Sequence, residues 1–83
     1  MEKHYVVVCS WSNEETPQSI TEIIGVRHSY EDAVDLFNSR LTEEKQYAKE
    51  NNYTVYEDSE SIFEAGLEGY CATNFTLLYI EQV

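Results

Sequence analysis

Residues 29–52 read SYEDAVDLFNSRLTEEKQYAKENN, and this stretch is long and periodic enough to predict a helix. Ser29 and Asp32 have the spacing of a capping box, in which side chains bind backbone N–H groups that the first turn leaves without partners. Asn51-Asn52 suits the end of the helix, because Asn tolerates the left-handed conformation found there. We therefore predict a helix over about residues 29–51, and it decides how the rest of the chain is arranged.

The predicted helix has an apolar stripe along one side. Acidic residues stand in its first turn and lysines near its end, where both suit the helix dipole. Most of the remaining positions are polar. One side of the helix is therefore expected to be buried. The stripe consists of Tyr30, Ala33, Val34, Phe37, Leu41 and Ala48.

Strands are expected on both sides of the helix. His4–Trp11 is rich in β-branched and aromatic residues, which is typical of a strand covered on both faces, and Ile20–Arg27 predicts a second strand. The polar residues between them include the only proline and predict a loop. Tyr53–Glu57 predicts a short third strand, and Tyr70–Val83 predicts the last and longest one.

This order of elements predicts an α+β domain with the arrangement ββαββ. We expect residues 1–83 to form one domain, a single four-stranded antiparallel or mixed sheet with the one long helix packed on one face. The segment 58–69 leaves two possibilities open. Ser59–Ala65 is either one helical turn stopped by Gly66 or a loop that buries Ile62, Phe63 and Leu67.

One helix cannot cover such a sheet. A helix is about 10 Å across, whereas four strands at about 4.8 Å spacing are wider. Yet His4–Trp11 places apolar side chains on both of its faces. We therefore expect a homodimer that forms through the uncovered sheet face. The alternatives are that segment 58–69 folds across this face, or that aromatic rings cover it themselves.

The charge of the chain is strongly negative, at −11 over 83 residues, while 42% of the residues are hydrophobic, so we expect a folded acidic domain. No lysine or arginine follows Lys49. This half of the chain disfavours direct binding of nucleic acid and favours a basic protein surface. The alternative is that the acidic residues bind no partner and only maintain solubility. The candidate protein-binding residues are Tyr47, Tyr53, Tyr56, Glu57, Asp58, Glu60, Glu64, Glu68 and Tyr70.

Targeting and membrane signals are not evident in the sequence. The N-terminal residues lack the pattern of a signal peptide. No apolar run approaches the roughly 20 residues needed to cross a bilayer. We therefore expect a cytoplasmic protein without membrane contact, in which Cys9 and Cys71 are reduced thiols.

Residues that carry chemistry are scattered. Cys9 or Cys71 with His4 or His28 would supply a thiol and a base, but no nucleophile-turn signature surrounds either cysteine, and a buried structural cysteine is the usual case. The carboxylates Glu43-Glu44 are expected to be exposed.

Metal and cofactor signals are equally weak. Asp58, Glu60 and Glu64 could hold a hard cation only loosely, because the segment lacks the pattern of a calcium loop. Paired His or Cys spacings and glycine-rich phosphate loops are missing from the sequence. We expect no catalytic, cofactor-binding or metal-binding residues.

The first half of the chain resembles small uncharacterised bacterial and phage α+β proteins. The resemblance rests on the strand residues Tyr5-Val6-Val7-Val8, on Ile24-Gly25-Val26, and on the helix start Tyr30-Glu31-Asp32-Ala33. It carries no functional residues with it. The sequence therefore predicts a non-enzymatic accessory module that binds protein. The alternatives are a phage-type nucleic-acid mimic that inhibits a DNA- or RNA-binding host-defence protein, and a small cysteine-dependent enzyme.

Overall fold

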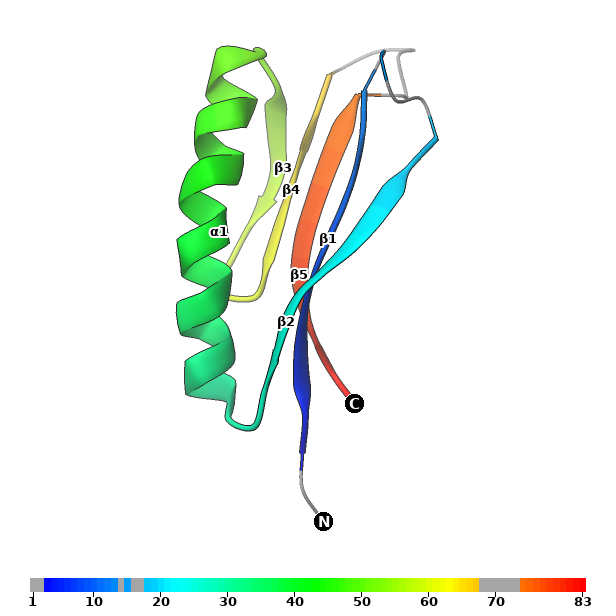
Figure 1. The fold of residues 1–83 in the computed structure, drawn as a ribbon. Helices are drawn as coiled ribbons and strands as arrows, with labels where there is room; N and C mark the ends of the chain where they lie inside the picture. Colours follow the sequence, from blue (N-terminus) through cyan, green and yellow to red (C-terminus); the bar gives the residue numbers. More distant parts are fainter. Residues whose placement is uncertain (1–2, 14, 16–17, 68–73) are drawn as a thin grey trace.

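A computed structural model describes residues 3–13, 15, 18–67 and 74–83 of the chain. Figure 1 shows two layers, with the single helix of this part of the chain lying along one face of a sheet. The elements in chain order are β1 (Tyr5–Ser12), β2 (Ile20–Arg27), α1 (Tyr30–Glu50), β3 (Thr54–Asp58), β4 (Ile62–Gly66) and β5 (Phe75–Gln82).

The sheet has five strands in the order β2-β1-β5-β4-β3, and every neighbouring pair is antiparallel. β1 lies between β2 and β5, so strands from opposite ends of the sequence are neighbours near its centre (Figure 1). Two register shifts occur, one opposite Val7/Val8 in β2 and one between Val55 and Glu57 in β3. β2 and β3 form the two edges.

The α+β class, the single sheet and the single helix on one face are confirmed, but the expected number of four strands is wrong. The fifth strand is β4, at the segment that we left open between a helical turn and a loop. Phe63 and Ala65 are fully buried beneath the helix, while Ile62 and Glu64 are exposed on alternate positions. This period of two belongs to a strand, and β4 obtains its hydrogen bonds from both β3 and β5.

The helix has the ends that the sequence predicts. Ser29 is the N-cap, and its hydroxyl accepts a hydrogen bond from the backbone N–H of Asp32 at 3.2 Å. Asn51 is the C-cap, and Asn52 has a φ of 58°, the left-handed conformation that reverses the chain into β3. These local signals decide where the helix begins and ends.

The core lies between the helix and the near face of the sheet. Ala33, Phe37 and Ala48 are the buried residues of the predicted helical stripe. Phe37 and Phe63 have the largest side chains that are fully buried. The core residues contributed by the sheet are Val7, Cys9, Phe63, Ala65 and Leu78.

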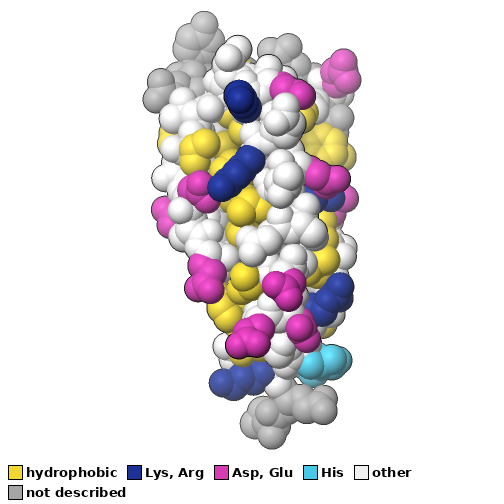
Figure 2. All heavy atoms as spheres, turned by 90° about the vertical axis from the view of Figure 1, so that its left-hand side faces the viewer, with side chains coloured by type: hydrophobic (Ala, Val, Ile, Leu, Met, Phe, Trp, Pro, Cys, Tyr) yellow, Lys and Arg dark blue, Asp and Glu magenta, His cyan; other side chains and the backbone are white. Residues whose placement is uncertain are grey.

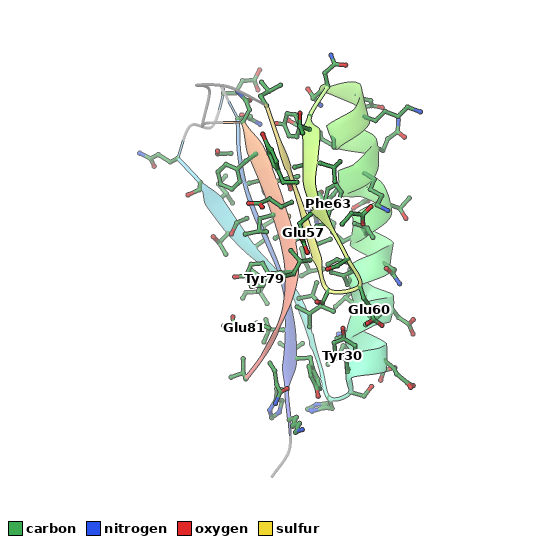
Figure 3. All side chains as sticks on the ribbon, turned by 180° about the vertical axis from the view of Figure 1, so that it is seen from behind. Tyr30, Glu57, Glu60, Phe63, Tyr79 and Glu81 are labelled. Carbon is green, nitrogen blue, oxygen red and sulfur yellow. The ribbon has the colours of Figure 1, made fainter. Side chains whose placement is uncertain are left out.

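The face of the sheet that points away from α1, called here the far face, is largely apolar. Val7, Cys9 and Leu78 point into the core on the helix side of the sheet. Successive side chains of a strand point to opposite faces. The far face therefore carries Val6 and Val8 of β1 and Leu77 and Tyr79 of β5. Figure 3 shows Tyr79 and Glu81 on the side of β5 away from the helix. No second layer covers this face within the described residues, since Asp58 ends β3, residues 59–61 form the turn and residues 62–66 form β4.

Candidate functional site

A polar cluster lies between the helix and the near face of the sheet, and we call it the Arg40 cluster. Its members are Arg40 and Glu44 of α1, Glu22 of β2, Trp11 of β1 and Thr76 of β5. Arg40 Nε lies 3.1 Å from Glu44 Oε2, and Arg40 Nη2 lies 3.3 Å from Glu22 Oε1. The guanidinium group therefore joins the helix to an edge strand.

Glu44 is the most enclosed carboxylate of this cluster. Its side chain is 12% exposed, and its Oε1 accepts a hydrogen bond from Thr76 Oγ1 at 2.5 Å. The expectation that Glu43-Glu44 would be exposed is therefore wrong for Glu44, although the Glu43 side chain is 73% exposed. The overlooked signal is position, since Glu44 follows Phe37 by two helical turns and precedes Ala48 by one, which places it on the buried stripe.

Glu22 extends the cluster to β2. It is paired with Cys9 in the register of β1 and β2, so its side chain points to the helix side of the sheet. Its Oε1 accepts a hydrogen bond from Trp11 Nε1 at 2.9 Å, in addition to the contact with Arg40. No buried side-chain nitrogen or oxygen in the described residues lacks a partner. The polar groups beneath the helix are therefore satisfied rather than strained.

Cys9 lies beside this cluster and is fully buried. Its Sγ is 3.8 Å from Glu44 Oε1 and 3.9 Å from Thr76 Oγ1. Burial and the negative charge of Glu44 raise the pKa of the Cys9 thiol to about 11. The rings of His4 and His28 lie together, 4.9 Å apart, but His4 precedes Cys9 by five strand residues, or about 16 Å. The geometry of Cys9 therefore disfavours a thiolate nucleophile, and Cys71 lies outside the described residues.

We expect Cys9 to react slowly with alkylating reagents in the folded protein. A pKa of about 11, compared with 9.0 for a free thiol, leaves about 100-fold less thiolate at pH 8, and burial slows access further. The measurement is the rate of iodoacetamide labelling in a Cys71→Ser variant, where Cys9 is the remaining thiol. Guanidinium should restore the rate of an ordinary thiol. Rapid labelling of the native protein would contradict this prediction.

The raised pKa of Cys9 also gives a direction for stability against pH. The folded protein holds this proton more tightly than the unfolded chain, so the contribution to stability is present below about pH 9 and is lost as the pH rises toward about 11. The thiol therefore favours the folded state at neutral pH.

A cavity of about 190 Å³ opens beside the Arg40 cluster. Three aromatic residues, Trp11, Tyr47 and Phe75, come from the helix and from two strands to line it. Together with its polar residues, the described lining consists of Trp11, Ser12, Asn13, Arg40, Glu44, Tyr47, Phe75 and Thr76.

The predicted protein-binding residues fall in two places. Tyr47 and Tyr53 lie at the C-terminal end of α1, where their rings meet edge to face at 5.6 Å. The second group is carried by β3, β4 and the turn between them and consists of Tyr56, Glu57, Asp58, Glu60 and Glu64. Glu68 and Tyr70 lie outside the described residues.

The second group, which we call the acidic hairpin, does not have one uniform face. Asp58 lies on the helix side, where its Oδ2 is 3.2 Å from Lys45 Nζ. Glu57 and Glu64 are directly opposite each other in the register of β3 and β4, on the far face. Like charges in this arrangement oppose folding slightly. None of the ion pairs among the described residues includes Glu57 or Glu64.

A metal site was not expected from the sequence, and the described residues contain no group of three or more His, Cys, Asp or Glu side chains arranged to hold an ion. Asp58 and Glu64 belong to opposite faces of the sheet. The weak possibility of a cation held by Asp58, Glu60 and Glu64 therefore gains no support from the positions of these residues.

Comparison of the chain with protein-family models, with curated proteins and with solved structures finds no match. In the part of the chain that the structure describes, no helix combines the length and apolar character that crossing a membrane requires. The function must therefore be argued from the two surfaces and the cavity described above.

Proposed function

We propose that this protein is a non-enzymatic, cytoplasmic binding module that pairs with a second copy through the far face and presents its acidic side to a basic protein. The observation that carries this proposal is the uncovered apolar far face. Ile23 is 64% exposed, Val26 45% and Ile62 38%. They surround the partly exposed Val6, Leu77 and Tyr79, while Val8 in the middle of the face is already buried by its neighbours.

The size of the far face supports a second copy as its occupant. The four strands β2, β1, β5 and β4 span about 19 Å, and the eight-residue strands are about 26 Å long, which gives about 500 Å² per protomer. Two such faces bury about 1,000 Å² in total, the lower bound for a specific interface. A dimer of this size is expected to be reversible rather than permanent.

The distribution of charge favours one symmetry for this dimer. The far-face acids are Glu57, Glu64 and Glu81, all on β3, β4 and β5, whereas the exposed far-face residues of β2 are Thr21, Ile23 and Val26. A two-fold axis parallel to the strands, between β1 and β5, places β4 over β2 of the second copy. The acids then meet uncharged residues at the rim. An axis across the strands would instead stack the acids on their own copies.

The outer strand of the acidic hairpin, β3, remains accessible at the rim of this dimer, because the paired strands are β2, β1, β5 and β4. Glu57 and Glu64 repel each other, so a partner that brings Lys or Arg to this edge relieves the repulsion as well as adding attraction. We therefore propose a basic protein surface as the second partner. The affinity of this basic partner for the acidic hairpin should fall as the salt concentration rises.

We place the nucleic-acid mimic second among the proposals. A mimic needs a continuous negative surface that follows a row of phosphates. On the helix side of the molecule, Asp and Glu side chains are interspersed with Lys and Arg (Figure 2). The acids of the hairpin, by contrast, are divided between two faces of the sheet. This distribution supports a local basic contact more than an extended mimic.

We expect Ile23→Lys to abolish dimerisation. A lysine at this exposed far-face position must bury its charge in an apolar interface or prevent contact. The measurement is mass in solution by light scattering at micromolar to millimolar concentration. The wild-type mass should approach twice 9.7 kDa and that of the variant 9.7 kDa.

Asn38→Lys is the matched control, because it adds the same charge at an exposed position of α1 and should leave the dimer intact. A wild-type protein that remains monomeric over this range would overturn the dimer.

A further inference from the structure

Arg40 and Glu44 line the cavity as one cation and one anion, but the immediate surroundings of Arg40 carry an excess of negative charge. Three carboxylates surround one guanidinium, since Arg40 lies within 3.7 Å of Glu43 as well as near Glu22 and Glu44. Three negative charges against one positive charge leave a net charge of −2. The other ion pair of the described residues, between Lys45 and Asp58, lies elsewhere along the helix.

The position of the carboxylates strengthens this field. Glu44 lines the cavity itself and is 12% exposed, so its charge is less screened than that of a surface carboxylate. The apolar part of the cavity wall, with Trp11 and Tyr47, lowers the local dielectric around Glu44. The neighbouring Cys9 responds to the same field, because Glu44 contributes to the rise in its pKa. An anion is therefore disfavoured here, and a cation is favoured.

The walls of the cavity suit a planar cation. Trp11 of β1 and Tyr47 of α1 line the cavity from the helix side of the sheet, whereas Phe75 borders it from β5 and alternates with Thr76 toward the far face. Aromatic rings attract cations through their negative faces, and a guanidinium group also stacks on them because it is flat and weakly hydrated. An ammonium group gains the first of these interactions without the second. A guanidinium group also has donors in a fork that matches a carboxylate.

We propose that this cavity receives an arginine side chain of the basic partner protein, with the guanidinium group against Glu44 and beside the rings of Trp11 and Tyr47. This inference rests on the proposed function, because it names the chemistry by which the partner is recognised. Tyr47 links the two, since it is both a predicted protein-binding residue and part of the cavity wall.

The test uses Trp11 as the reporter, because it is the only tryptophan of the chain and lines the cavity. The full chain is titrated with the peptide acetyl-Gly-Arg-Gly-amide and followed by tryptophan fluorescence and calorimetry. The control peptide replaces arginine by citrulline, which has nearly the same shape and no charge. We expect the arginine peptide to bind at least tenfold more tightly and to change the Trp11 emission.

Two variants connect the binding to the cavity. Glu44→Gln is expected to weaken the arginine peptide at least tenfold, whereas Asp35→Asn, which removes an exposed charge of the same helix, should leave it unchanged. Because Glu44 also binds Thr76 and Arg40, the helical circular dichroism of Glu44→Gln is checked first. Tyr47→Leu keeps an apolar side chain on a half-exposed position and should weaken binding severalfold.

Each outcome decides the inference. Equal binding of the arginine and citrulline peptides, or no binding of either at millimolar concentration, would overturn it. Free propylguanidinium carries the same side-chain group and should compete with the peptide, and a failure to compete would overturn the cavity as the site of the guanidinium group. Dimerisation is measured separately by mass. If the protein dimerises but does not bind the peptide, only the arginine-binding inference is contradicted. If the protein binds the peptide but remains monomeric, only the proposed dimer is contradicted.

Discussion

Phe37→Ala is expected to lower the free energy of unfolding by about 3–5 kcal/mol. Phe37 is fully buried in the centre of α1, and its ring packs in the core with Val7, Phe63 and Leu78. Alanine removes the transfer free energy of the ring and leaves a cavity that the surrounding strands cannot close. A small domain has a total stability of about 5 kcal/mol or somewhat more, so the variant should be partly unfolded at room temperature.

Urea denaturation followed by far-ultraviolet circular dichroism measures this loss. The matched control is Tyr56→Ala, because Tyr56 is an aromatic residue of β3 that is 52% exposed. This control should cost less than about 1 kcal/mol. A Phe37→Ala variant as stable as Tyr56→Ala would show that the packing of the helix on the sheet does not hold the fold together. Both variants should be compared at one protein concentration, since dimerisation adds to the apparent stability.

Gly66→Ala is expected to cost about 1–3 kcal/mol, because a side chain at this position meets backbone. A Cβ atom on Gly66 would lie 2.8 Å from the carbonyl oxygen of Asn74 and 3.4 Å from Cα of Phe75. Neither atom can move without disturbing the pairing of β4 with β5, in which Gly66 stands opposite Phe75. The strand that the sequence left undecided therefore depends on a glycine for its close approach to β5.

Gly25→Ala provides the comparison for this second prediction. A Cβ atom on Gly25 would lie 2.7 Å from Leu36 Cδ2, which is the far end of a flexible side chain and can rotate away. We expect this variant to lose less than about 1 kcal/mol. The measurement is again the free energy of unfolding in urea. A loss for Gly25→Ala as large as that for Gly66→Ala would mean that the identity of the contacted atom does not decide the cost.

The proposed binding function depends on two features that differ in chemistry. The far face offers apolar area, with Ile23 as its most exposed large residue, and charge is confined to its β3–β5 side. The cavity instead lies on the helix side of the sheet and offers the carboxylate of Glu44 beside Trp11 and Tyr47. Because the sheet separates them, the two surfaces can be occupied at the same time. A dimer formed through one would carry two copies of the other.

The candidate residues show how far sequence reasoning reached. The described acids of the predicted set, Glu57, Asp58, Glu60 and Glu64, lie on β3, β4 and the turn between them, as their closeness in the sequence requires. Their division between two faces follows from strand alternation, once β4 is recognised as a strand. The Arg40 cluster was missed because its members are far apart in the chain, with Thr76 and Glu44 separated by 32 residues and Arg40 and Glu22 by 18.

The sequence by itself determined the helix, because its stripe, its Ser29 cap and its Asn51-Asn52 ending are interactions between residues a few positions apart. It also determined β1, β2 and the apolar character of both faces of β1, since alternation is local. Only the tertiary structure decided that residues 62–66 form a strand, because five residues lack the length to signal one and obtain their hydrogen bonds from β3 and β5. Only the tertiary structure also decided the environment of Glu44. Its enclosure depends on strands that approach the helix from both halves of the chain, and no local pattern encodes that approach.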